Sequence, residues 1–129
     1  MKYLTAEEIL RIHFNLIEDY GGAHGIRDEE RTRSVIEAPK MMAFGQEQYA
    51  TTFEKAALYA RNIIADHPFL DGNKRTGITA MGIFLIRNGC ELTATPKELE
   101  DFAVQIAVAK LDVADIADWL KIHSRTSRQ

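Results

Sequence analysis

The feature that most constrains the fold is a helix-start signal that occurs three times in the chain. A threonine followed three residues later by a glutamate stands at Thr5, Thr51 and Thr95, and this capping box satisfies two backbone N–H groups at a helix N-terminus. Apolar residues follow each threonine at three- and four-residue spacing, which predicts amphipathic helices with one buried face. The chain is therefore predicted to be all-α.

Further start and stop signals extend this pattern to a bundle of about six helices. Asp112 precedes another helical segment, Gly21-Gly22 ends the first helix, and Gly89 ends the fourth. No segment shows the strict alternation of apolar and polar residues that indicates a strand. Residues 40–50 follow neither period and are predicted to form a flap-like loop with a short extended piece. The predicted helices cover approximately residues 6–20, 28–38, 52–65, 74–88, 96–106 and 113–120.

Composition narrows the class of protein. A chain of 129 residues that is 46% hydrophobic and 27% charged has the size and make-up of one soluble domain, so residues 1–129 are expected to form a single domain. One cysteine, Cys90, excludes an internal disulfide framework and a cysteine-based zinc site. Apolar runs such as residues 83–86 are only a few residues long, so no membrane span is expected. Acidic residues within the first twenty argue against a secretory signal, which makes the reducing cytoplasm the expected location. A net charge of −3 disfavours broad nucleic-acid binding.

The segment of residues 67–76 differs from the rest, because it places an imidazole, a carboxylate, an amide and two cations between two predicted helices. The helix that begins near Lys74 presents unpaired backbone N–H groups and a partial charge of about +0.5 at its N-terminus. Gly72 lets the backbone approach a ligand closely. Lys74 and Arg75 add two cations where they disfavour the helix itself. This conflict between local charge and helix stability indicates an anion-binding site.

Two further side chains suggest what that site does to an anion. Asp71 would repel a phosphate unless a magnesium ion lay between them, and one carboxylate with phosphate oxygens is a usual way to hold Mg²⁺. His67 can accept a proton near neutral pH, and a base beside phosphates implies transfer of a phosphorus group to a hydroxyl. Phe69 is expected to be buried and to anchor the loop. Each residue alone also fits an ordinary turn or a solvated surface, whereas their combination favours a functional site. Asn73 before Lys74 excludes a Walker P-loop.

The segment His67-Pro68-Phe69-Leu70-Asp71-Gly72-Asn73-Lys74-Arg75 resembles the signature of the Fic family, His-x-Phe-x-(Asp/Glu)-Gly-Asn-Gly-Arg-x-x-Arg. It is more similar to the loop of the Doc (death-on-curing) branch, His-x-Phe-x-Asp-Ala-Asn-Lys-Arg-Thr. The similarity extends to Tyr20-Gly21-Gly22 and to Arg87-Asn88-Gly89, so it covers nearly the whole chain. It implies a compact Fic-fold helical bundle.

The resemblance also implies a role for each residue of the loop. His67 matches the family's catalytic base, which deprotonates the target hydroxyl, and Asp71 matches the residue that holds magnesium between nucleotide phosphates. The remaining matches are to the residues that bind the nucleotide phosphates, and these are Gly72, Asn73, Lys74 and Arg75.

Two positions depart from the Fic pattern in the way that the Doc branch does. Lys74 replaces the second glycine, and Ile78 stands where AMP-transferring members carry a second arginine. The Doc resemblance implies that ATP lies reversed, so that its γ-phosphoryl group reaches the hydroxyl. Losing an arginine removes a bidentate phosphate clamp, while Lys74 supplies a point charge elsewhere, and both changes shift the preferred phosphate position. Gly72 instead matches the AMP-transferring members, because the Doc loop has alanine there.

The resemblance implies a toxin of a type II toxin–antitoxin system: a protein Ser/Thr kinase that uses ATP and Mg²⁺ and arrests translation. The implied target is a translation component, with elongation factor Tu as the family case. The implied partner is an antitoxin whose disordered C-terminal segment folds over the toxin, and apolar positions on the first or last helix are candidates for its groove. An AMP-transferase of protein hydroxyls and a non-catalytic docking module stay open as alternatives. No direct nucleic-acid partner and no membrane partner are expected.

A few residues outside the loop carry further expectations. Arg61 is expected to pair with Glu54 or Asp66 on the surface rather than to face the phosphates. Residues 41–49 correspond to the family's flap, which lays a target segment beside the active site, with an ordinary surface loop as the alternative. His13 is expected to be a core or boundary histidine, and residues 121–128 are expected to be frayed.

Overall fold

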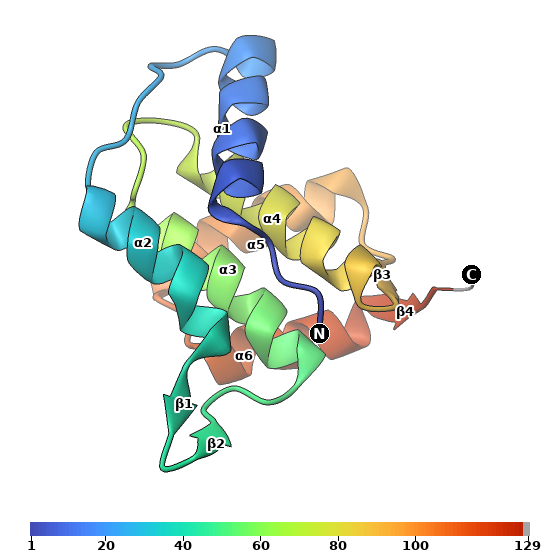
Figure 1. The fold of residues 1–129 in the computed structure, drawn as a ribbon. Coiled ribbons are helices and arrows are strands. Elements are labelled where there is room, and N and C mark those ends of the chain that lie inside the picture. Colours follow the sequence, from blue (N-terminus) through green and yellow to red (C-terminus); the bar gives the residue numbers. More distant parts are fainter. Residues whose placement is uncertain (128–129) are drawn as a thin grey trace.

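The computed structural model describes residues 1–127, which form six α-helices, one short 3₁₀ turn and four short strands (Figure 1). The predicted all-α, Fic-fold-like bundle is confirmed. The α-helices are α1 (Ala6–Tyr20), α2 (Glu29–Glu37), α3 (Thr52–Asp66), α4 (Asn73–Arg87), α5 (Pro96–Ala109) and α6 (Val113–Ile122). The strands are β1 (Met42–Ala43), β2 (Gln46–Glu47), β3 (Cys90–Leu92) and β4 (Ser124–Thr126), and the 3₁₀ turn covers Ala38–Lys40. None of the helices within residues 1–127 is both long and apolar enough to cross a bilayer.

The helices begin where the capping signals predicted. At Thr5, Thr51 and Thr95 the threonine hydroxyl accepts a hydrogen bond from the backbone N–H three residues later, and the glutamate side chain there bonds back to the threonine N–H. Asp112 forms the same reciprocal cap with Asp115 at the start of α6. These local contacts fix the helix starts because each one satisfies backbone donors that have no partner within the helix.

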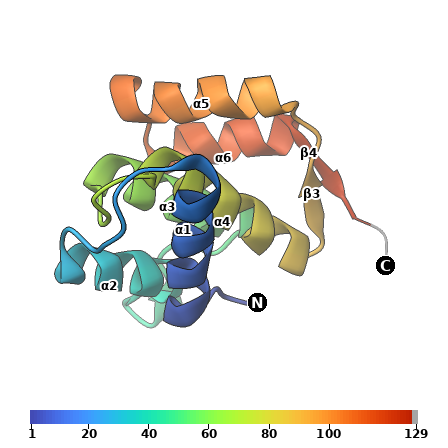
Figure 2. The same cartoon turned by 90° about the horizontal axis from the view of Figure 1, so that it is seen from above.

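The hydrophobic core is centred on α3 and α4. Figure 2 shows α5 and α6 stacked on one side of this pair, and α1 and α2 lie on the other side. Gly77 allows the close approach of α4 to α3, since a β-carbon there would lie 2.7 Å from Ile64 Cγ1 and 3.2 Å from the Ala60 carbonyl oxygen. The α3–α4 connection, residues 67–72, therefore joins the two most tightly packed helices, which gives the loop a rigid base.

The predicted flap-like loop is a small hairpin in which β1 pairs antiparallel with β2. Lys55, fully buried near the start of α3, holds the hairpin: its Nζ donates to the Pro39 carbonyl at 2.7 Å and pairs with Glu47 at 3.1 Å. The extended piece is confirmed, but the hairpin lies just before the first residue of α3, whereas His67 follows the last (Figure 1). A helix of 15 residues is about 20 Å long. The length of α3 thus separates the hairpin from His67, which favours the alternative of an ordinary surface loop over a flap beside the active site.

The end of the described chain also differs from the prediction. Lys121 belongs to α6, and β4 pairs antiparallel with β3, with Cys90 opposite Thr126 and Leu92 opposite Ser124. The prediction of a frayed tail is wrong up to Ser127; Arg128 lies outside the described residues. No strand was predicted at residues 90–92 or 124–126. Strands of three residues are too short to show an alternating pattern. The pairing of β3 with β4 joins segments that are distant in sequence, so no local sequence pattern predicts it.

Candidate active site

The α3–α4 loop begins with a residue in an uncommon conformation. His67 ends α3 with φ +51° and ψ +61°, in the left-handed region. Pro68 explains why the helix stops there, since a proline disfavours the α conformation in the residue before it. Phe69 is 1% exposed and its ring stacks on His13 at 3.9 Å between centroids. The predicted anchoring role of Phe69 is confirmed.

The N-terminus of α4 lacks the caps that the other helices have. Among the six α-helices of residues 1–127, only α4 has no side chain bonded to its first backbone N–H groups, and its first turn contains no acidic residue. Gly72 takes the N-cap position with φ +78°. These N–H groups remain available to an anion, and the helix dipole adds partial positive charge.

Gly72 also packs against α1, a contact that the sequence did not predict. A β-carbon at Gly72 would lie 3.0 Å from Ile17 Cδ1 and 3.7 Å from His13 Cδ2, so it would point toward α1. The glycine is therefore needed for the contact between the loop and α1. Phosphate binding by Gly72 stays a prediction, and it concerns the backbone of this residue.

Asn73 braces the loop from within. It is buried, and its side chain spans the backbone of Phe69: Phe69 N–H donates to Asn73 Oδ1 at 3.1 Å, and Asn73 Nδ2 donates to the Phe69 carbonyl at 3.0 Å. The same Nδ2 lies 3.5 Å from His67 Nδ1, at the outer limit of a hydrogen bond. The amide of Asn73 is thus engaged in holding the loop, and phosphate binding by Asn73 stays a prediction for its backbone N–H.

The charged residues of the loop lie at the surface. Lys74 and Arg75 are exposed, and the guanidinium of Arg75 lies 4.1 Å from the centre of the Tyr20 ring, at the end of α1. Asp71 is exposed as well, and its Oδ2 accepts a hydrogen bond from the Ala23 N–H at 2.7 Å. Its other oxygen accepts no hydrogen bond from residues 1–127.

All six predicted site residues line one groove of about 840 Å³. These are His67, Asp71, Gly72, Asn73, Lys74 and Arg75. Residues of α5, such as Leu99 and Ala103, also line the groove, and α1 contributes Leu16 and Tyr20. The groove thus joins an uncapped helix N-terminus, two cations, a carboxylate and an imidazole in a space large enough for a nucleotide.

The groove has the donors for a magnesium ion only if a ligand supplies the rest. No group of three or more His, Cys, Asp or Glu side chains within residues 1–127 could hold a metal by itself. Asp71 contributes one carboxylate, and Mg²⁺ is commonly bound by one or two carboxylates together with substrate phosphates. The residues present therefore fit a magnesium ion that arrives with a nucleotide.

Several residues that sequence reasoning missed support the loop from outside. Arg27, just before α2, and Arg31, in its first turn, donate to backbone carbonyls of Asp66 and His67. His13, on α1, is buried and its Nε2 lies 2.8 Å from the Asp71 carbonyl, so the ring donates its proton there. The prediction of His13 as a core histidine is confirmed, and burial lowers its pKa while this hydrogen bond opposes the shift. All these partners are at least 35 residues away in sequence, so no local signal could reveal them.

Arg61 pairs with Asp66 at 3.7 Å, as predicted, and does not line the groove.

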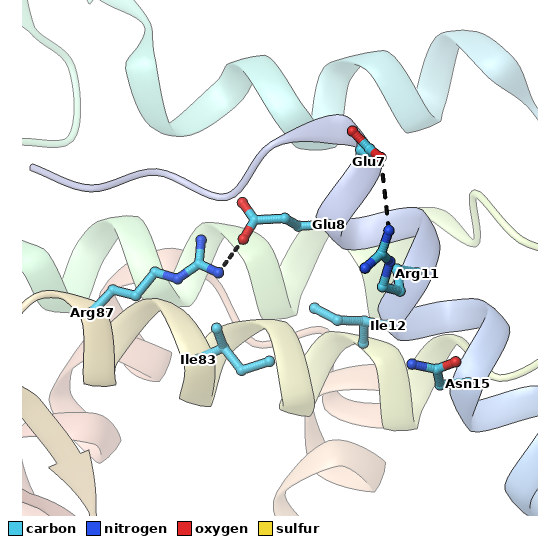
Figure 3. Close-up of a pocket in the computed structure, with 7 residues that line it drawn as sticks. All are labelled: Glu7, Glu8, Arg11, Ile12, Asn15, Ile83 and Arg87. Carbon is cyan, nitrogen blue, oxygen red and sulfur yellow. Dashed lines mark hydrogen bonds and ion pairs between the residues drawn. The ribbon is translucent and has the colours of Figure 1, made fainter.

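A second, smaller groove of about 400 Å³ lies between α1 and α4 (Figure 3). Its charged residues pair with one another: Glu8 bonds to Arg87, and Glu7 lies 3.8 Å from Arg11. The hydrogen bond from Arg87 lowers the pKa of Glu8 to about 2. Ile12 and Ile83 line the same groove beside these ion pairs. Paired charges around apolar side chains do not favour an isolated anion, and they suit a peptide surface better.

The chain belongs to the Fic/DOC family, whose model matches residues 3–85. It is similar to the "Protein kinase doc" of Escherichia phage P1, with 32% identity over 121 residues that cover 94% of each chain. It is also similar to the "Toxin Doc" of Mycolicibacterium smegmatis, with 30% identity over 118 residues, 90% of this chain and 88% of that one. The family resemblance read from residues 67–75 is thus confirmed.

Proposed function

We propose that this protein is a toxin of the Doc type: a protein Ser/Thr kinase that transfers the γ-phosphoryl group of ATP to a target hydroxyl. The observation that carries the proposal is the uncapped start of α4, where Lys74 and Arg75 flank free N–H groups beside His67. The names of the two relatives, one a protein kinase and one a toxin, support it.

In the proposed reaction the residues of the chain mainly position the nucleotide phosphates and neutralise their negative charge. The backbone of Gly72 and Asn73 donates to the phosphates, and Lys74 and Arg75 balance their charge. Asp71 holds a magnesium ion, which when bound neutralises charge on the phosphates. Phosphoryl transfer depends largely on such positioning and charge stabilisation.

His67 acts as the general base. Its Nε2 has no hydrogen-bond partner within residues 1–127, so this atom can take the proton of the target hydroxyl. The freed oxygen then bonds to the γ-phosphorus, and the bond between that phosphorus and ADP breaks. A positioned base of this kind contributes roughly 10²–10⁴-fold to the rate.

The lining of the groove favours γ-phosphoryl transfer over AMP transfer. Ile78 lines the groove where the AMP-transferring members carry an arginine, so one cation fewer is available for the phosphates. A glycine at position 72 is the feature that argues for AMP transfer, but its presence also follows from the packing of the loop, since a β-carbon there would meet Ile17. AMP transfer is the second candidate, and a docking module without catalysis is the third.

We further propose a translation component, with elongation factor Tu as the first candidate, as the target in the cytoplasm. The proposed partner is a cognate antitoxin whose disordered C-terminal segment folds on the toxin. The groove between α1 and α4 is our candidate surface for it, because it combines apolar Ile12 and Ile83 with ion pairs that an amphipathic segment could match (Figure 3).

Parallel labelling tests the chemistry. The purified protein is incubated with Mg²⁺ and a bacterial extract, or with purified elongation factor Tu, and with ATP labelled at either the α- or the γ-phosphate. Label on a protein from γ alone supports the kinase, and label from α indicates AMP transfer. His67→Ala is the control, since it should lower the transfer rate by roughly 10²–10⁴-fold while it keeps its fold. Transfer at full rate by folded His67→Ala would refute the role of His67.

A further inference from the structure

The conformation of His67 must be held by something outside its own helix. In the left-handed region the β-carbon crowds the following carbonyl oxygen, so residues other than glycine avoid it. Within residues 1–127 only Phe44, His67 and Lys110 have positive φ without being glycine. Strain of this kind persists where surrounding contacts determine the conformation, and it is often found at active sites.

Arg27 makes the contacts that determine it. Arg27 Nε donates to the His67 carbonyl at 2.8 Å, and Arg27 Nη2 donates to the Asp66 carbonyl at 3.1 Å. These two carbonyls belong to the peptide planes on either side of the His67 α-carbon. Their relative orientation is the φ and ψ of His67. One rigid, planar guanidinium therefore fixes both dihedral angles at once.

The position of Arg27 is itself fixed by the loop that it supports. Its backbone N–H donates to the Pro68 carbonyl at 2.7 Å. Ile26 forms an antiparallel bridge with Phe69, and Leu70 N–H donates to the Gly25 carbonyl at 3.1 Å. The connection between α1 and α2 thus runs alongside the α3–α4 loop (Figure 1). The guanidinium therefore starts from a fixed backbone rather than from a free surface position.

We propose that Arg27 is a positioning residue, which holds His67 in its left-handed conformation so that the imidazole lies in the groove. The inference rests on the proposed function of His67 as the base. The positive charge of Arg27 also favours the C-terminus of α3, but charge alone does not set dihedral angles. A lysine at this position would keep the charge and lose the two-carbonyl fork.

Arg31 offers a matched control. It also lies at the C-terminus of α3 and donates to the Asp66 carbonyl at 2.8 Å, but it makes no hydrogen bond to the His67 carbonyl. Replacing Arg31 by lysine is therefore the same substitution at the same helix end. It keeps the positive charge and leaves the hydrogen bond to the His67 carbonyl in place.

The test compares Arg27→Lys with Arg31→Lys in steady-state transfer kinetics. We expect Arg27→Lys to lower kcat about 10–100-fold, because a small misplacement of a reacting group is this costly, with the KM for ATP within about twofold. Arg31→Lys should change neither value by more than about twofold. In a His67→Ala background, Arg27→Lys should cause no further loss, since it acts only through His67.

Three results would overturn the proposal: an unchanged kcat for Arg27→Lys, an equal loss for Arg31→Lys, or a loss that persists in the His67→Ala background. A purely structural arginine would lower the melting temperature without this dependence on His67. If Arg27→Lys does not fold, Arg27→Gln takes its place in the same comparison.

A second readout separates this proposal from the proposed function. The ¹³Cα and ¹³Cβ chemical shifts of His67, which report backbone conformation, should change in Arg27→Lys and stay constant in Arg31→Lys. If the wild-type protein transfers no label at all, the proposed function fails and these shifts still decide the role of Arg27. Unchanged shifts in Arg27→Lys would refute it.

Discussion

Replacing Gly72 by alanine tests the packing of the loop against α1. The change introduces two separate costs. Gly72 has φ +78°, and an L-residue in the left-handed conformation costs roughly 1–2 kcal/mol. The new β-carbon would also lie 3.0 Å from Ile17 Cδ1, on a side chain that is itself buried. Forcing an extra methyl group into a packed site costs about 1–3 kcal/mol. Gly72→Ala should therefore lower the free energy of unfolding by roughly 2–5 kcal/mol.

Gly45→Ala separates the two costs. Gly45 has φ +77°, almost the value at Gly72, but a β-carbon there would meet no atom within 4 Å. Only the backbone cost applies, and the reduced entropy of the unfolded chain offsets part of it equally in both variants. Urea unfolding of the wild type and both variants gives the comparison. Gly72→Ala should be less stable than Gly45→Ala by about 1 kcal/mol or more. Equal stabilities would refute the argument that Gly72 is required by α1.

Three further predictions concern the base of the site and the opposite groove. Phe69→Ala should destabilise the fold by about 3–5 kcal/mol in urea unfolding, since a 1% exposed aromatic side chain is removed. Burial lowers the pKa of His13 below 6.5, so the unfolded chain binds protons first and stability should fall as pH drops below 6.5; the pH dependence should weaken in His13→Gln. The pKa of Glu8 is lowered to about 2 from 4.5, so its contribution is complete above pH 4.5 and is lost toward pH 2; Glu8→Gln should lose this part of the acid-unfolding profile.

The sequence predicted most of the fold because helix starts are local. Thr5, Thr51, Thr95 and Asp112 each cap the helix that follows within three residues, and all four caps are present. The pairing of β3 with β4 and the position of the β1–β2 hairpin were not predictable in this way. Both depend on contacts between segments that are distant in sequence, such as Lys55 with Pro39.

In the candidate site, too, the residues of a local motif were predictable and the residues that contact it from distant parts of the chain were not. His67, Asp71 and the residues at the start of α4 form one continuous motif, so their shared groove was predictable from spacing. The residues that shape this motif were not predictable. Arg27 lies 40 residues before His67, and His13 lies 58 residues before Asp71. A surface arginine and a helix-face histidine carry no sign of these partners in the sequence.

The start of α4 shows how the fold accommodates a site that opposes its own stability. Every other α-helix within residues 1–127 has a side-chain cap, whereas α4 has none and places Lys74 and Arg75 at its positive end. A serine or aspartate at the N-cap would stabilise the helix by roughly a few tenths of a kcal/mol relative to Gly72, but it would occupy the N–H groups that a phosphate needs. The compensation comes from buried contacts behind the groove: Asn73 on Phe69, the ring of His13 on Phe69, and Gly77 of α4 against α3. These contacts hold the loop without using its anion-binding N–H groups, so the helix end can remain open to a ligand.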